Sequence, residues 1–132
     1  MKHLFVPYGL ALILKQKDFS EPCFGKHFVP DSPEFRFRYN TQGHPINYND
    51  GSYGRFISAP MYQQVVDWFR DVHKIIIVID FYNNGDEWLD TTYDIRISEF
   101  KHFKTHDTFV GGESKNYYDV FNTAIEEALK LI

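Results

Sequence analysis

The stretch SAPMYQQVVDWFRDVHKIIIVIDFYNNGDEWLDTTYDIRIS, residues 58–98, carries most of the information about the fold. Ser58 can cap the free amides of a helix start, and Pro60 is tolerated in a first helical turn. Apolar residues then recur three and four positions apart, which predicts a helix over 59–73. The five β-branched residues at 75–79 predict a strand that is covered on both faces and lies at the centre of a sheet.

The second half of this stretch has the pattern of a β-hairpin. Asn83-Asn84-Gly85-Asp86 predicts a tight turn, because Asn-Gly tolerates the positive φ angles that a two-residue turn needs. A return strand is expected over 88–98, where residues of two kinds alternate. One side of that strand carries Thr91, Tyr93, Ile95 and Ile97. The two strands are therefore expected to pair in antiparallel fashion.

Shorter elements are expected on the N-terminal side of this stretch. Segment 7–18 reads as a helix that ends at Ser20-Glu21-Pro22, because Pro disfavours a helical conformation in the residue before it. Strands are expected over 23–29 and 34–39. The alternation in the second strand sends three rings towards the core. These rings are Phe35, Phe37 and Tyr39.

A final helix is expected at the C-terminal end, with Ser114 as its cap. Its apolar stripe follows the helical period and comprises Tyr118, Phe121, Ile125, Ala128, Leu129 and Ile132. Before it, Thr108-Phe109-Val110 is a possible short edge strand. The fold class that follows is α+β, as a single domain over 1–132 in the order α-β-β-α-β-β-(β)-α. A mostly antiparallel sheet with helices packed on one side is expected.

Composition excludes several classes of protein. The chain has 132 residues, of which 43% are hydrophobic and 24% charged, so it is neither disordered nor collagen-like. Its net charge of −4 argues against non-specific nucleic-acid binding, which relies on contacts between basic residues and phosphate. Aromatic residues reach 18%, and rings serve both in cores and as anchors at binding surfaces.

The N-terminal residues imitate a signal peptide. Met1-Lys2-His3 precedes the apolar run LFVPYGLALIL, yet the run ends in Lys15-Gln16-Lys17-Asp18 without a small-residue cleavage site. The only cysteine, Cys23, leaves no internal disulfide and is expected to be a small buried hydrophobe rather than a catalytic thiol. A cytoplasmic protein with no membrane-spanning segment is therefore expected.

The sequence shows no recognisable catalytic set and predicts no metal and no cofactor. His102 and His106 are four apart, but their surroundings look like a loop or a strand and offer no third ligand. Residues 80–99 hold six acidic residues against Arg96 alone. That excess is read as the solvent face of a hairpin, with a docking patch for a basic partner as the alternative. Gly111-Gly112-Glu113-Ser114 resembles an anion-binding helix start only weakly.

The main functional expectation is a non-enzymatic binding protein with a protein partner. The irregular segment 40–56 is predicted to be a loop, or a loose hairpin that turns at Asn49-Asp50-Gly51. Tyr48, Tyr53 and Arg55 are the expected contact residues, because amphipathic rings on an adaptable loop recur at interfaces.

Two alternatives stay open. The first is a small enzyme or small-molecule-binding domain whose site contains His27, His44 or His73. It would need a concave pocket with converging polar groups. The second is a self-associating structural protein, whose mass in solution would be a multiple of 15.7 kDa.

Three blocks of the chain are distinctive and together cover 57 of its 132 residues. They are FVPYGLALILKQKDFSEPCFG (5–25), ISAPMYQQVVDWFRDVHKI (57–75) and NYYDVFNTAIEEALKLI (116–132). These blocks resemble a family of small uncharacterised proteins from phage and prophage regions of gut-dwelling anaerobic bacteria. The resemblance implies a shared fold, since the blocks coincide with the three predicted helices. It implies no activity, cofactor or catalytic residue.

Overall fold

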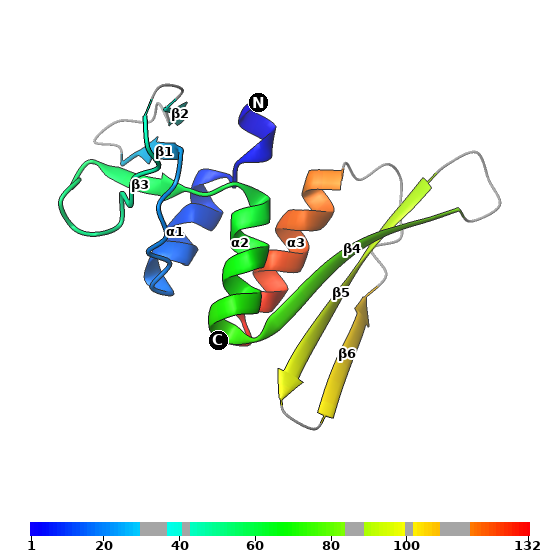
Figure 1. Cartoon of the computed structure of the whole chain (residues 1–132). Coiled ribbons are helices and arrows are strands. Elements are labelled where there is room, and N and C mark those ends of the chain that lie inside the picture. The colour runs from blue at the N-terminus through cyan, green and yellow to red at the C-terminus, as the bar shows by residue number, and fades with distance from the viewer. Residues whose placement is uncertain (30–36, 41–42, 84–88, 100–101, 109–116) are drawn as a thin grey trace. The chain divides into compact units, whose positions relative to one another are not determined.

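The computed structural model describes residues 1–29, 37–40, 43–83, 89–99, 102–108 and 117–132. The chain divides into two compact units, an N-terminal unit (Met1–Val65) and a C-terminal unit (Val66–Ile132). Each unit contains helix and antiparallel sheet, so the predicted α+β class is confirmed (Figure 1). The strands form two three-stranded sheets, one in each unit.

The elements follow the expected order with one additional strand. The N-terminal unit begins η1 (Lys2–Leu4), α1 (Tyr8–Gln16), β1 (Gly25–Phe28), β2 (Phe37–Tyr39) and β3 (Phe56–Ala59). Helix α2 (Tyr62–Trp68) and a π-helical turn, η2 (Phe69–His73), come next. The C-terminal unit continues with β4 (Ile75–Asn83), β5 (Leu89–Glu99), β6 (His102–Thr108) and α3 (Tyr117–Leu129). No helix in the described ranges is long and apolar enough to cross a membrane.

The sheet of the N-terminal unit has the order β2-β1-β3, with antiparallel pairing throughout. His27 pairs with Phe37 on one side and with Ile57 on the other, so these side chains share one face. The N-terminal segment covers that face, where the Phe5 ring lies 4.9 Å from the Phe37 ring. Phe37 thus faces the core, as the alternation predicts, while Tyr39 is 40% exposed at the rim of the same face.

Close packing of this face depends on Gly25. A Cβ atom there would lie 2.5 Å from the carbonyl oxygen of Ala59 and 2.6 Å from the Phe5 ring. Only a residue without a side chain allows β1 to pass this close to both neighbours. The glycine therefore permits a close approach at the start of β1.

Helix α1 ends earlier than predicted, and the residues that end it are not those expected. Asp18 adopts a left-handed conformation with φ of 62°. The Phe19 amide donates to the Leu14 carbonyl and the Asp18 amide donates to the Lys15 carbonyl. These two bonds form a Schellman motif, in which the buried Phe19 packs next to the helix end. Local capping, rather than Pro22, therefore terminates the helix.

The predicted helix over 59–73 is wrong at its start. Ser58 and Ala59 belong to β3 and pair with Lys26 and Gly25. The Ser58 hydroxyl accepts a hydrogen bond from the Tyr48 amide at 3.0 Å, so it caps no helix. The cap is instead formed by Gln64, whose side-chain oxygen accepts from the Met61 amide at 3.0 Å.

The C-terminal unit corrects the position of the β-branched strand. Its sheet has the order β4-β5-β6, so β4 lies at an edge and β5 at the centre. Burial alternates along β4: Ile75 and Ile77 are buried, whereas Ile76 is 36% exposed. The strand is thus covered on one face only. An uninterrupted β-branched run indicated a strand correctly but did not determine how many of its sides are covered.

The predicted β4–β5 hairpin is confirmed by its register. Ile75 pairs with Ile97 at one end and Asn83 with Leu89 at the other. Tyr93 and Ile95 are both buried, as the alternation predicts. Three residues of the predicted turn at 83–86, Asn84, Gly85 and Asp86, lie outside the described residues. The third strand, β6, begins earlier than the short edge strand expected at 108–110, of which 109 and 110 lie outside the described residues.

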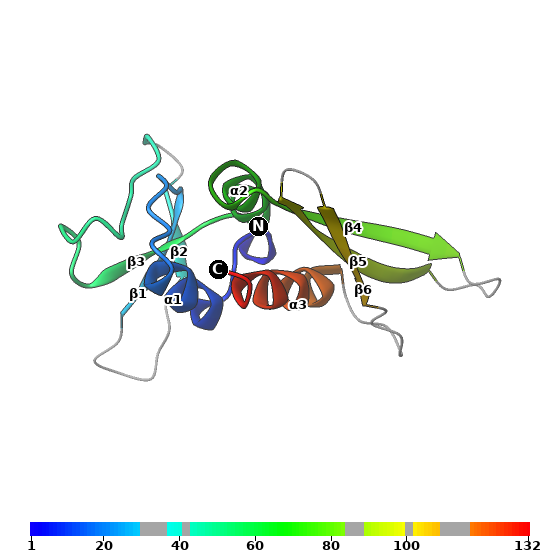
Figure 2. The ribbon, with the colours of Figure 1, turned by 90° about the horizontal axis from the view of Figure 1, so that it is seen from below.

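Helix α3 packs against β4 and β5, as Figure 2 shows from a second direction. Its buried residues follow the predicted helical period. They are Val120, Phe121, Ala124, Ile125, Ala128 and Leu129. The expected cap, Ser114, lies outside the described residues. Each of the two units thus has its own sheet, with a helix packed against it.

Candidate functional site

The structure places the three predicted contact residues in different environments. Tyr48 is only 3% exposed, whereas Tyr53 is 37% exposed and Arg55 is also exposed. The Tyr48 and Tyr53 rings meet edge to face with centroids 5.3 Å apart. Arg55 lies in the turn that follows, where the Phe56 amide donates to the Tyr53 carbonyl at 2.7 Å. Tyr48 therefore supports the loop from beneath, and Tyr53 and Arg55 are presented to solvent.

The loop that carries these residues is held in place by Asn49. Its side-chain nitrogen donates to the Phe19 carbonyl at 2.8 Å, and its side-chain oxygen accepts from the Ser58 amide at 3.1 Å. Asn47 adds a local turn, because its side-chain oxygen accepts from the Asn49 amide at 2.9 Å. The loose hairpin expected here is thus anchored at its base to both α1's end and β3. A loop held in this way presents Tyr53 at a low entropic cost.

Lys26 completes the site from the neighbouring strand. Its ammonium group lies 4.2 Å from the centre of the Phe56 ring and 5.0 Å from the centre of the Tyr48 ring. Both distances are within the range of cation–π attraction. Sequence reasoning missed Lys26, because β1 and the loop are separated along the chain. Its place opposite Ser58 becomes visible only through the strand register.

Two cross-strand pairs extend this surface. Lys26 pairs with Arg38 on β2, which puts two basic side chains side by side. Phe28 pairs with Phe56 on β3, with ring centroids 5.4 Å apart in an edge-to-face arrangement. These residues share the face of the sheet that is opposite to Phe5 and His27. We call this surface the cationic–aromatic face, and it comprises Lys26, Phe28, Arg38, Tyr53 and Phe56.

The electrostatics of the N-terminal unit favour an anionic contact. This unit contains seven Lys and Arg residues against five Asp and Glu residues, whereas the C-terminal unit contains seven against thirteen. The net charge of −4 thus hides a weakly basic unit. Burial raises the pKa of Tyr48 above its ordinary value, with a smaller contribution from Tyr53. Tyr48 therefore stays a neutral phenol beneath the basic groups.

The three histidines of the alternative enzyme hypothesis, and Cys23, each have their own surroundings in the structure: two of the histidines pack against other parts of the fold and one is exposed. His27 is buried, and its Nε2 lies 2.9 Å from the Val6 carbonyl, to which it donates. His44 is exposed, and the His73 ring packs 4.5 Å from the Trp68 ring. Burial raises the pKa of Cys23 to about 12, and its thiol donates to the Glu21 carbonyl. The expected burial of this cysteine is confirmed.

The metal and acidic-patch expectations fall mostly on residues with undescribed side chains. His102 and His106 both lie on β6, where four residues of extended backbone span about 13 Å. That spacing is too long for two ligands of one ion. No group of three metal-ligating side chains occurs within the described ranges. Of the acidic side chains at 80–99, the described part of the chain includes only Asp80, which is exposed. Gly111-Gly112-Glu113-Ser114 lies outside it.

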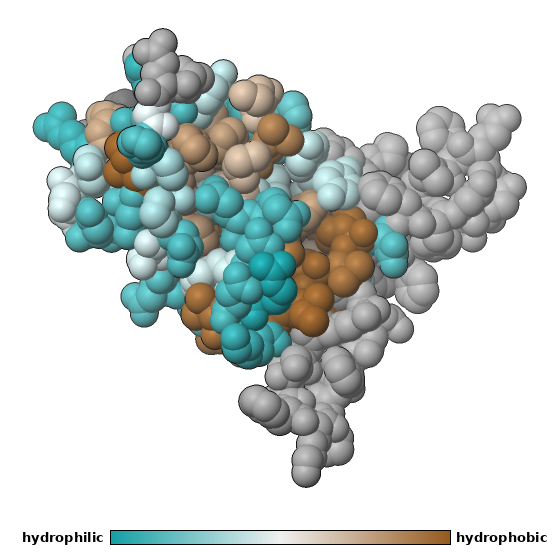
Figure 3. Space-filling view, viewed as in Figure 1, coloured by the Kyte–Doolittle hydropathy of each residue, from teal (hydrophilic) through white to brown (hydrophobic). Residues whose placement is uncertain are grey.

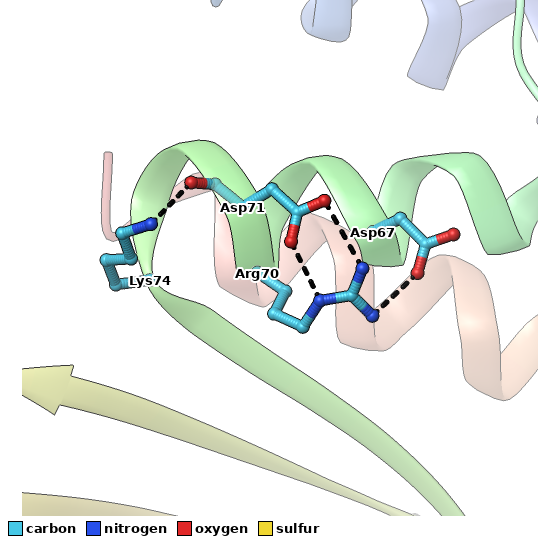
Figure 4. A network of polar contacts seen from close by, with 4 residues as sticks. All are labelled: Asp67, Arg70, Asp71 and Lys74. Atoms are coloured by element: carbon cyan, nitrogen blue, oxygen red, sulfur yellow. Dashed lines mark hydrogen bonds and ion pairs between the residues drawn. The ribbon is translucent and has the colours of Figure 1, made fainter.

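A second polar cluster lies at the end of α2 and in η2 (Figure 4). Arg70 donates to both carboxylate oxygens of Asp71, at 2.8 and 3.2 Å, and to Asp67 at 2.9 Å. Lys74 donates to the Asp71 carbonyl at 2.7 Å. Hydrogen bonds from Arg70 hold the pKa of the Asp71 carboxyl below its ordinary value. All four residues belong to consecutive turns and are solvent-accessible, so their ion pairs contribute little net stability.

Comparisons of the chain with protein-family models, curated proteins and solved structures found no match.

Proposed function

We propose that this chain is a binding protein that captures an acidic segment of a partner protein on the cationic–aromatic face. The main support for the proposal is that Tyr53 is exposed on a loop that is held in place. Asn49 anchors this loop, and the buried Tyr48 ring packs beneath Tyr53. Amphipathic rings that are held rigidly in this way are typical anchors of protein interfaces.

The chemistry of the surface favours an anionic partner. Half-buried Lys26 and exposed Arg38 lie side by side, and Arg55 in the loop adds a third cation, which is exposed. Carboxylates can bind these cations while apolar or aromatic side chains of the partner pack on Tyr53 and Phe56. The weak positive charge of the N-terminal unit would also attract an acidic partner.

The resemblance of three sequence blocks to proteins of phage and prophage regions suggests a biological setting. In that setting the chain acts as an accessory factor of a mobile element, in the cytoplasm, through contact with a host or phage protein. No bond-making step is part of this proposal.

The test compares what the immobilised wild-type chain and its variants capture from a host lysate. Tyr53→Ala and Arg55→Ala are expected to reduce capture of the same acidic proteins by tenfold or more, as loss of an interface anchor does. Tyr39→Ala is the matched control for Tyr53, since its ring is equally exposed, at 40%, but lies on the opposite face of the sheet. Lys15→Ala is the control for Arg55, because Lys15 is an exposed basic residue on α1.

Two results would contradict the proposal. One is equal capture by the wild-type chain and by the Tyr53 and Arg55 variants. The other is loss of capture in the two controls as well, which would indicate general destabilisation. Thermal unfolding of each variant separates the second result from a true binding defect.

A further inference from the structure

Strand β4 is a long strand at the edge of the sheet in the C-terminal unit. Within the described residues of the C-terminal unit, β5 is the only strand that pairs with β4. The other side of the β4 backbone therefore carries N–H and C=O groups that are available to another strand. The strand is nine residues long, whereas edge strands are commonly short.

The side chains along this edge do not protect it. Residues 75–79 are all β-branched, and this run contains no charge and no proline. Ile76 is 36% exposed, and Val78 on the same face is half-buried. Figure 3 shows hydrophobic residues gathered along the first part of β4. A strand edge with an uncharged run of this kind is a template for pairing with an added strand.

We infer that β4 pairs with β4 of a second copy of this chain, antiparallel and centred on Ile77, to give a two-fold symmetric dimer. The charges that flank the run favour this occupant and this register. Lys74 lies in a left-handed turn immediately before β4, and Asp80 follows the β-branched run. Antiparallel pairing centred on Ile77 therefore brings Lys74 of each copy to the end of the interface where Asp80 of the other copy lies. A shift of the centre by one residue in either direction removes both of these pairs.

The same register matches the apolar side chains. Ile76 of one copy lies opposite Val78 of the other, and Ile75 lies opposite Ile79. Pairs of β-branched residues are favourable across antiparallel strands. The exposed Ile76 and half-buried Val78 of both copies then form one apolar cluster. The two sheets join into a continuous six-stranded sheet in which β4 becomes internal, which is the environment that its sequence predicts.

Sedimentation velocity of the full chain tests the dimer. The wild-type chain is expected to sediment with twice the mass of 15.7 kDa. Asp80→Lys places two lysines opposite each other at both ends of the interface, and it is expected to raise the dissociation constant at least about tenfold. Lys74→Asp does the same with two carboxylates, although it also removes the hydrogen bond to the Asp71 carbonyl.

Restoration of the charge pairs distinguishes this interface from any other. The double variant Lys74→Asp, Asp80→Lys regenerates opposite charges in both pairs and is expected to dimerise like the wild-type chain. An equimolar mixture of the two single variants is expected to form a heterodimer, because each chain then offers the charges that the other lacks.

Glu126 is an exposed residue on α3, so Glu126→Lys is the matched control for the charge change. This variant is expected to keep the mass of the wild-type dimer. Far-UV circular dichroism confirms that each variant is folded. The inference is overturned if the wild-type chain is monomeric at 0.1 mM or above (~10⁻⁴ M, where even weak interfaces are populated). It is also overturned if the single variants dimerise as well as the wild-type chain, or if neither the double variant nor the mixture restores the dimer.

Discussion

His27 illustrates how one buried side chain links stability to pH. Its ring is 5% exposed and lies between the Tyr8 and Phe37 rings, with centroids 5.7 and 5.5 Å away. Burial lowers the pKa of His27 below its ordinary value, and the hydrogen bond to the Val6 carbonyl offsets only part of this effect. The folded state therefore favours the neutral imidazole, whereas the unfolded chain accepts a proton at about pH 6.5.

The resulting prediction is a loss of stability in acid. Above about pH 6.5 the contribution of His27 is fully present, because neither state is protonated. As the pH falls below that value, the unfolded state binds the proton first and the free energy of unfolding decreases until the lower, folded-state pKa is reached. Each unit of pKa difference corresponds to about 1.4 kcal/mol. Urea unfolding at pH 7.5 and 5.5 measures the effect.

His27→Gln keeps a donor for the Val6 carbonyl but does not titrate, so its stability is expected to depend less on pH than that of the wild-type chain. His44→Gln is the control, since His44 is exposed. An equal loss between pH 7.5 and 5.5 in the wild-type chain and in His27→Gln would show that another group is responsible.

At the scale of elements, Gly9 and Gly25 have opposite effects on packing. A Cβ atom at Gly25 would overlap the Ala59 carbonyl and the Phe5 ring, whereas a Cβ atom at Gly9 would meet nothing within 4 Å. Gly9 lies on α1, where a glycine loses more backbone entropy on folding than an alanine does. The strand therefore requires its glycine and the helix does not.

Alanine substitutions at the two glycines are expected to change stability in opposite directions. Gly25→Ala should lower the free energy of unfolding by about 1–3 kcal/mol, because the tight contact leaves no room for a methyl group. Gly9→Ala should raise it by up to about 1 kcal/mol. Denaturant unfolding measures both variants, and each serves as the control for the other. Destabilisation of equal size in both variants would contradict the close approach at Gly25.

The ends of the helices show what local sequence patterns reveal and what they miss. Asp18 and Lys74 both adopt left-handed conformations, with φ of 62° and 60°, and both follow the end of a helix. Glycine is the usual signal for such a position, so neither end is apparent from composition. The sequence also predicts the wrong start for α2, because a local pattern does not show how the backbone is paired. Ser58 has the side chain of a helix cap, yet its backbone pairs with Lys26 in the sheet.

At the scale of the whole molecule, charge is divided unequally along the chain. The C-terminal unit contains thirteen acidic residues against seven basic ones, and the N-terminal unit contains five against seven. The net charge argues against non-specific nucleic-acid binding, but that argument applies to the sum of the charges and leaves room for a basic surface on one unit. The cationic–aromatic face lies entirely in the weakly basic unit.

Binding of the proposed acidic partner is therefore expected to depend on salt. Exposed charges are screened over about 10 Å at 0.1 M ionic strength, and this length shortens as salt is added. Affinity for a captured acidic protein should fall several-fold between about 50 and 300 mM NaCl, chiefly through a slower association rate. Biolayer interferometry with the wild-type chain measures both rates. The proposed β4 dimer provides a comparison, because its central contacts would be apolar and its affinity should depend less on salt. An affinity independent of salt would contradict an electrostatic contact.

The sequence by itself determined the type of most elements and the α+β class. Periodicity identified α1, β5 and α3, because it depends only on which residues an element buries. The β-branched run identified β4. The irregular segment 40–56 predicted Tyr48, Tyr53 and Arg55 as contact residues, although Tyr48 is buried in the structure and so is not presented to a partner.

Only the tertiary structure decided which segments become neighbours. The edge position of β4, the division into two sheets and the approach of Lys26 to Tyr48 and Phe56 all depend on pairing between distant segments. Such pairing is selected by the packing of the whole chain, and no local pattern encodes it. The same reason explains why a β-branched run could be recognised as a strand while its position at the edge of the described sheet could not.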